Sequence, residues 1–450
     1  MLGRSILTLP LLVAAACSPA VPVEVHELST APPTAAEAAA TPATGEPAEP
    51  AVTCEEALRG DGSVLVCRTP RVTAATPRAL ALERAGHRGA LKLVLERATE
   101  RDLALLDRAP LDALEIRDAS ELTSLSPLRG QESLEEIAVV AAGRCALTSL
   151  DGVDRLPALK RLRLVGCPSL ADVSALERAT ALRALEIADG GVTDLSAIAR
   201  TPNLVALHVP GLRAASLEPL AQLTSLAVLD LSGADAKDIG PVGALVGLVT
   251  LDLGGVRAAS FAPLGSLDYL ETLSLAKTGV ADVEFLRGKP RLTTLDLSGD
   301  DVRDLAPVGT LSVLRALDLS RDPVSDLRPL AGASALERLS LAGTPAKNLA
   351  PLARLEHLTE LDLSGAAATS LAPLGGLPAL ARLRLDGTQV KDLAPLHRLV
   401  SLRALSLRDA AVTSVQPVAA LRELTFVDVR GSRVKDAGRL ARPGRTVVGP

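Results

Sequence analysis

Aliphatic and polar residues alternate in a repeated pattern, Leu-x-x-Leu-x-Leu, over most of the chain. Ile187 and Val209 replace leucine in two early copies. The clearest copies begin at Leu182, Leu204, Leu226, Leu248, Leu270, Leu292, Leu314, Leu336, Leu358, Leu380, Leu402 and Leu424. Each start lies 22 residues after the last. Such a constant interval indicates an internal structural repeat.

Less regular copies extend this pattern toward the N-terminus. They begin at Leu111, Leu134 and Leu159, and a degenerate copy lies near Ala90. We therefore expect about fifteen or sixteen coils over residues 89–440.

Each copy contains two local signals. Leu295 and Leu297 alternate with polar residues, and this period of two predicts a strand with one buried face. Asp304 follows and can cap the N–H groups of a short turn, in which Pro307 fixes φ. The same Asp/Ser-x-x-Pro spacing recurs at Asp326/Pro329, Ser370/Pro373, Asp392/Pro395 and Ser414/Pro417. The remaining residues leave no room for a full α-helix of about 11 residues beside the strand.

A single coil cannot bury its own leucines, so the coils are expected to stack and share one core. Stacked strands would form a parallel sheet on the inner, concave side, with neighbouring strands about 4.8 Å apart. Short 3₁₀ or turn segments would lie on the convex side. The predicted fold class is thus an α/β-type repeat solenoid.

The copy at residues 380–396, LARLRLDGTQVKDLAPL, resembles the 22-residue leucine-rich repeats of internalins. The resemblance covers about three quarters of the chain. It implies a curved horseshoe whose concave sheet binds a protein partner. We find neither the immunoglobulin-like domain nor the wall-sorting motif of internalins, so the resemblance supports the repeat module and not host-cell invasion.

Composition and charge narrow the function classes. The chain is 48% hydrophobic but only 1% aromatic, which fits one aliphatic packing solution copied many times. The net charge of -5 is too mild for a nucleic-acid-binding protein, which would need a clustered basic face.

The N-terminus predicts export. Arg4 precedes a short apolar run, Ile6–Ala16, which is too short to span a bilayer and reads as a secretory signal over residues 1–16. It resembles a bacterial lipoprotein signal, which implies lipidation of Cys17, although Ala14 stands where that family usually has leucine. The alternative is cleavage near Ala16 and free secretion. The expected location is the bacterial cell envelope, or the exterior.

Three further segments flank the repeats. Residues 17–51 are rich in Pro, Ala and Glu, lack Lys and Arg, and are expected to form a disordered linker. Residues 52–88 are expected to form an N-terminal cap, and residues 441–450 a C-terminal tail. Basic residues are concentrated at the end of the repeats. They form either a polar capping surface or a contact with an anionic surface, and the sequence allows both interpretations.

Four cysteines are disulfide candidates. Cys54 and Cys67 could close a short loop in an oxidising compartment, with free core thiols as the alternative. Cys145 and Cys167 are 22 residues apart and could bridge adjacent coils, or fill a slot for small buried residues. We expect no metal site, because no ligand set has zinc spacing.

Candidate binding residues follow from the strand pattern. The residue between the last two leucines of each copy should point outward from the concave sheet, and Phe426 should lie in the neighbouring column. These candidates are Arg163, Glu186, His208, Asp230, Asp252, Asp296, Asp318, Asp362, Arg384 and Phe426. They form an acidic middle with basic ends. Asp here is either a docking feature or a repeat residue retained for solubility.

We expect no catalysis and no cofactor. The motifs of common hydrolases, nucleotide-binding proteins and metalloproteases are absent, and an open sheet lacks the pocket that separates two pKa values. The favoured function is a monomeric scaffold that binds a protein, or a polysaccharide, through its concave face, with membrane contact only through a lipid. The alternative is a self-associating envelope spacer.

Overall fold

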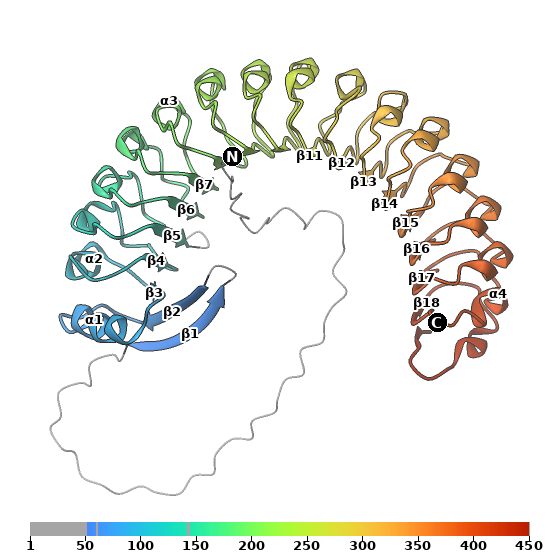
Figure 1. The fold of residues 1–450 in the computed structure, drawn as a ribbon, viewed down its shortest axis with the longest axis horizontal. Coiled ribbons are helices and arrows are strands. Elements are labelled where there is room, and N and C mark those ends of the chain that lie inside the picture. Colours follow the sequence, from blue (N-terminus) through green and yellow to red (C-terminus); the bar gives the residue numbers. More distant parts are fainter. Residues whose placement is uncertain (1–51, 60–61, 142–144, 450) are drawn as a thin grey trace, which may run out of the picture. The chain divides into compact units, whose positions relative to one another are not determined.

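The copies stack one strand per coil. The computed structural model describes residues 52–59, 62–141 and 145–449. In this part, strands β2 to β19 pair in parallel and in chain order. Figure 1 shows the strands along the inner side of an arc and the turns along its outer side. The expected solenoid with a concave parallel sheet is confirmed.

The first strands are longer than the later ones. The early strands are β1 (Thr53–Arg59), β2 (Gly62–Thr69), β3 (Ala90–Leu95), β4 (Ala113–Ile116), β5 (Glu136–Val140), β6 (Arg161–Val165) and β7 (Ala184–Ala188). The three-residue strands are β8 (Ala206–His208), β9 (Val228–Asp230), β10 (Thr250–Asp252), β11 (Thr272–Ser274), β12 (Thr294–Asp296), β13 (Ala316–Asp318), β14 (Arg338–Ser340), β15 (Glu360–Asp362), β16 (Arg382–Arg384), β17 (Ala404–Ser406), β18 (Phe426–Asp428) and β19 (Thr446–Val448).

The outer side consists mainly of 3₁₀ turns. Four α-helices are present in the described residues: α1 (Thr76–Gly86), α2 (Glu100–Leu105), α3 (Ser196–Ala199) and α4 (Gln416–Ala419). The 3₁₀ segments are Ser126–Leu128, Val153–Arg155, Ser174–Arg178, Glu218–Gln222, Gly240–Ala244, Ala262–Ser266, Glu284–Leu286, Val308–Thr310, Arg328–Gly332, Ala350–Arg354, Ala372–Gly376, Ala394–Arg398 and Ala437–Leu440.

The turns begin where the Asp/Ser-x-x-Pro pattern predicts. Asp304 Oδ1 accepts the N–H of Ala306 at 2.8 Å, and Asp392 Oδ1 accepts that of Ala394 at 2.7 Å. The side chain thus satisfies an N–H group that no carbonyl of the turn can reach. A proline in the first turn loses no hydrogen bond, because that N–H has no partner within the turn.

The core is one continuous ladder of aliphatic side chains. Leu251, Leu253, Leu295 and Leu297 are each at most 1% exposed, as their inward alternation predicts. Burying one such leucine contributes about 1.5–3 kcal/mol. Every coil therefore depends on its two neighbours for stability.

Both ends of the described solenoid are covered. At the start, β1 and β2 form an antiparallel pair, and α1 precedes β3. At the end, the Arg445 guanidinium donates hydrogen bonds to the carbonyls of Leu424 (2.6 Å), Ala419 (3.1 Å), Leu421 (2.5 Å) and Leu440 (3.3 Å). Arg445 thus donates hydrogen bonds to carbonyl groups that would otherwise accept them from a further coil.

Candidate binding surface

The parallel register brings the predicted concave residues into one continuous row along the sheet, called here the central row. It consists of Arg163, Glu186, His208, Asp230, Asp252, Ser274, Asp296, Asp318, Ser340, Asp362, Arg384, Ser406 and Asp428. The outer row lies two residues earlier on each strand and includes Thr250, Thr272, Thr294 and Phe426. Phe426 is half-buried beside Ala404 of the preceding strand.

Aspartates of the central row also shape the backbone. Asp252 Oδ1 accepts the N–H of Gly254 at 2.8 Å, and Asp296 Oδ1 accepts that of Ser298 at 2.9 Å. The chain then turns through a left-handed residue such as Gly255, with φ of 78°. These carboxylates therefore stabilise the turn after the strand, which gives Asp a structural reason to recur.

Ion pairs neutralise the N-terminal part of the concave face. Arg163 pairs with Glu186 of the next strand at 2.9 Å, and His208 lies 3.7 Å from Asp230 when measured Nδ1 to Oδ2. In the outer row, Arg161 pairs with Glu136 at 3.0 Å. The charges of Arg161 and Arg163 are thus compensated within the sheet, whereas His208 compensates Asp230 only when its ring is protonated.

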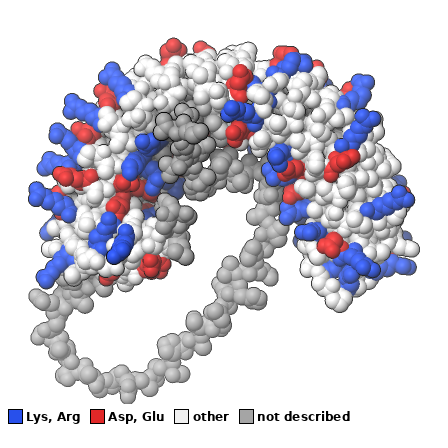
Figure 2. Space-filling view, viewed as in Figure 1, with Lys and Arg blue, Asp and Glu red and all other residues white. Residues whose placement is uncertain are grey.

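The C-terminal part is paired in the same way. Arg384 Nη1 lies 3.5 Å from Asp362 Oδ2, and Arg382 pairs with Glu360. Arg430 forms an ion pair with Asp428 at 2.6 Å and holds the pKa of that carboxyl below its usual value, against the upward effect of burial. The positive charge expected at this end of the concave face is thus largely neutralised by carboxylates of the sheet. Elsewhere on the molecule, Lys and Arg side chains gather near both ends of the arc (Figure 2).

The middle of the central row differs from its two ends in that some of its carboxylates have no basic partner in the described part of the chain. Among the described residues, no Lys or Arg forms an ion pair with Asp252 or Asp296. Partial burial raises the pKa of both carboxyls, and the nearby charges of Asp230 and Asp318 respectively raise them further. The half-buried Thr272 and Thr294 stand beside them, whereas Thr250 is buried. Strands β10 to β12 therefore present carboxylates and hydroxyls with no basic counterpart.

The candidate cysteines lie in two pairs. A disulfide joins Cys54 on β1 to Cys67 on β2, and a second joins Cys145 to Cys167, which lie 22 residues apart. The lipidation candidate Cys17 and the residue 1–51 segment lie outside the described residues.

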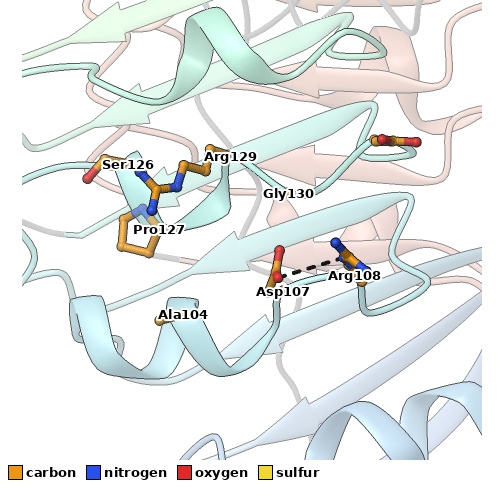
Figure 3. Close-up of a pocket in the computed structure, with 8 residues that line it drawn as sticks. Ala104, Asp107, Arg108, Ser126, Pro127, Arg129 and Gly130 are labelled. Carbon is orange, nitrogen blue, oxygen red and sulfur yellow. Dashed lines mark ion pairs between the residues drawn. The ribbon is translucent and has the colours of Figure 1, made fainter.

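The described residues contain no group of three or more His, Cys, Asp or Glu side chains placed to hold a metal ion, and no helix long and apolar enough to cross a membrane. A shallow pocket of about 550 Å³ is lined by Asp107, Arg108, Arg129 and their neighbours (Figure 3). Its Asp107 and Arg108 lie 4.0 Å apart, and it contains none of the candidate binding residues.

Solved structures with a similar fold include leucine-rich-repeat proteins of several organisms. A leucine-rich-repeat protein of Leptospira interrogans aligns with a TM-score of 0.69 at 20% identity, covering 78% of this chain and 93% of its own. An internalin of Listeria monocytogenes aligns at 0.57 and 21% identity, covering 68% and 88%. The fold is a leucine-rich-repeat horseshoe.

A chain of the Drosophila Toll–Spätzle complex also matches, with a TM-score of 0.61 and 18% identity over 81% of this chain and 53% of that one. No family model and no curated protein sequence matches this chain. The comparisons therefore establish the fold of this leucine-rich-repeat chain.

Two features of the structure were missed by sequence reasoning. The compensation of charges across strands follows from the 22-residue spacing, since Arg384 stands one repeat after Asp362. The burial of Asp300 and Asp322 on adjacent coils was also missed, although both align with threonines of neighbouring copies. The repeat register is the signal that could have revealed both.

Proposed function

We propose that this protein is an exported, non-catalytic scaffold that binds a protein partner through the middle of its concave sheet. The observation that carries the proposal is the contrast along the central row. Charges at both ends are neutralised within the sheet, whereas Asp252 and Asp296 have no basic partner in the described residues. Complementary charge on a partner would provide specificity and a faster association.

Two lines of support favour a protein partner and export. A chain of similar fold belongs to the complex of Toll with Spätzle, in which one protein binds another. Two disulfides fit an oxidising compartment outside the cytosol. We further propose that residues 1–16 are a signal peptide, that Cys17 carries a lipid in the cell envelope, and that residues 17–51 form the tether.

The test uses crosslinking and pulldown from native membranes with a neutralised concave face. In the triple variant Asp252→Asn, Asp296→Asn and Asp318→Asn, the side-chain Oδ1 can still accept the turn N–H, so the fold should persist. A matched control changes the exposed Glu132, Glu218 and Glu356, which lie outside the strands, to Gln.

We expect the concave variant to lose the captured partner and the control to retain it. Equal capture by both variants would refute the concave site. Light scattering at rising protein concentration gives a second readout. Self-association without any other captured protein would favour the envelope spacer instead.

A further inference from the structure

Three exposed apolar side chains lie on one edge of neighbouring coils, outside the concave sheet. Val246, Tyr269 and Val313 are 55%, 51% and 37% exposed. In the described residues, only Leu82 and Val400 are comparably exposed large hydrophobics, and both lie on other coils. With Arg291, these three residues are called the rim patch. Exposed apolar groups that gather on neighbouring coils are typical of interaction sites.

The repeat places these residues next to one another. Tyr269, Arg291 and Val313 follow each other at 22-residue intervals, and each directly precedes the leucine that opens a copy. The backbone ladder continues beside them, since Glu271 N–H donates to Val249 O at 2.8 Å. Stacked coils are about 4.8 Å apart. Arg291 Cζ lies 4.5 Å from the centre of the Tyr269 ring, which holds the ring in place.

The surroundings of the rim patch are acidic. Glu271 is exposed two residues after Tyr269 and has no ion pair in the described part of the chain, and Asp252 and Asp296 lie on strands of the same coils. Two nearby cations form ion pairs within the chain, Arg315 with Glu337 and the buried Lys289 with Asp268, and Arg291 stacks on the Tyr269 ring. An incoming apolar group would therefore meet carboxylates that lack a basic partner.

We infer that the rim patch and the acidic middle of the central row form one docking site for a basic protein segment. The segment carries an aliphatic or aromatic side chain that packs on Tyr269 and Val313, flanked by Lys or Arg that reach Glu271, Asp252 and Asp296. Tyr and Arg supply most of the binding free energy in many protein interfaces, and Tyr269 is the single tyrosine of the chain. This inference rests on the proposed function and names its partner chemistry.

The test selects binders from a random 12-residue peptide display library on the purified protein. Enriched peptides are then measured by fluorescence anisotropy against four variants. Tyr269→Ala removes the ring, and Tyr269→Phe retains it. The triple variant Glu271→Gln, Asp252→Asn and Asp296→Asn removes the charges. Val400→Ala is the matched control, because Val400 occupies the rim position of Val246 seven copies later and is 68% exposed.

We expect enriched peptides to combine Lys or Arg with Leu, Ile or an aromatic residue. Tyr269→Ala and the triple variant should each weaken binding about tenfold or more, whereas Tyr269→Phe and Val400→Ala should change it less than about twofold. Acidic peptides, carbohydrate-only binding in a glycan array, or no enriched peptide would overturn the inference. So would self-association that Tyr269→Ala abolishes, because it identifies a second copy as the occupant.

The two proposals fail in different ways. Peptides that depend on Asp252 and Asp296 but not on Tyr269 leave the concave function standing and remove the rim patch from it. Peptides that bind the triple variant and Tyr269→Ala as tightly as the wild type refute the joint docking site, and the capture of the native partner by the concave variant then tests the proposed function on its own.

Discussion

Two carboxyl groups are buried in a slot that neighbouring copies fill with threonine. Asp300 and Asp322 are 5% and 1% exposed, and they align with Thr278 and Thr344. Asp322 Oδ1 accepts the N–H of Asp300 at 3.1 Å, and Asp300 Oδ1 accepts that of Gly279 at 2.6 Å. The second oxygen of each carboxyl, Oδ2, is buried without a hydrogen-bond partner. Such a group is costly when it carries a charge.

Burial therefore shifts the titration of both groups upward. Desolvation raises the pKa of Asp300 to about 6. Desolvation, followed by the charge of Asp300, raises the pKa of Asp322 to about 8. Both lie above the unfolded value of 3.8, so the folded state binds these protons more tightly. Their contribution to stability is full below about pH 4 and is lost as the pH rises through about 6 for Asp300 and about 8 for Asp322.

The variant Asp322→Asn removes the larger of these costs. Holding Asp322 protonated at pH 7 costs roughly 4 kcal/mol relative to the unfolded chain, where the group ionises freely. The amide keeps an oxygen for the Asp300 N–H and carries no charge. We expect the free energy of unfolding at pH 7 to rise by about 2–4 kcal/mol, with no gain near pH 4.

The measurement is urea unfolding, followed by circular dichroism, at pH 4, 7 and 8. Hydrogen exchange of peptides covering residues 278–324 reports the same change locally, which suits a solenoid that need not unfold in one step. Asp301→Asn is the control, because Asp301 is exposed beside the slot and its loss changes the net charge equally. If Asp322→Asn is no more stable than Asp301→Asn at pH 7, or if its gain is equally large at pH 4, the reasoning is wrong.

Three further predictions concern other parts of the chain. Replacing Cys145 and Cys167 with serine should lower the free energy of unfolding by about 3 kcal/mol in non-reducing calorimetry, because the unfolded chain regains the entropy that the closed loop removes; reduction of the wild type, which also opens Cys54–Cys67, should lower it at least as much. Arg445→Met should leave carbonyls of the last coil unsatisfied and weaken that coil by about 2–4 kcal/mol, seen as faster exchange over residues 419–448 but not in the first coils. Cys17→Ala should move the protein from the detergent phase to the aqueous phase in a phase-partitioning assay, and an unchanged distribution would contradict lipidation.

The fold was predictable because one period governs so much of the chain. Leu295 and Leu297 require a strand with a buried face, Asp304 starts the turn, and a coil of 22 residues can close only by stacking on its neighbours. The short helices α3 and α4 were not anticipated. They differ from the 3₁₀ turns of other coils by a small change in hydrogen bonding that the spacing of leucines does not encode.

The candidate site was predictable only in part, because a list of outward-facing residues does not show which of their charges are paired across neighbouring strands. Sequence reasoning placed Asp252 and Asp296 on the concave face, but it treated their charge as a property of each residue. The register shows that charge there depends on the residue one repeat away: Asp362 has Arg384 as its neighbour, whereas Asp252 has Asp230 and Ser274. The same logic locates Tyr269, whose significance comes from Arg291 one copy later and not from its own strand. In a solenoid, the chemistry of a surface is therefore determined by residues one repeat apart, and it is there that a binding site should be sought.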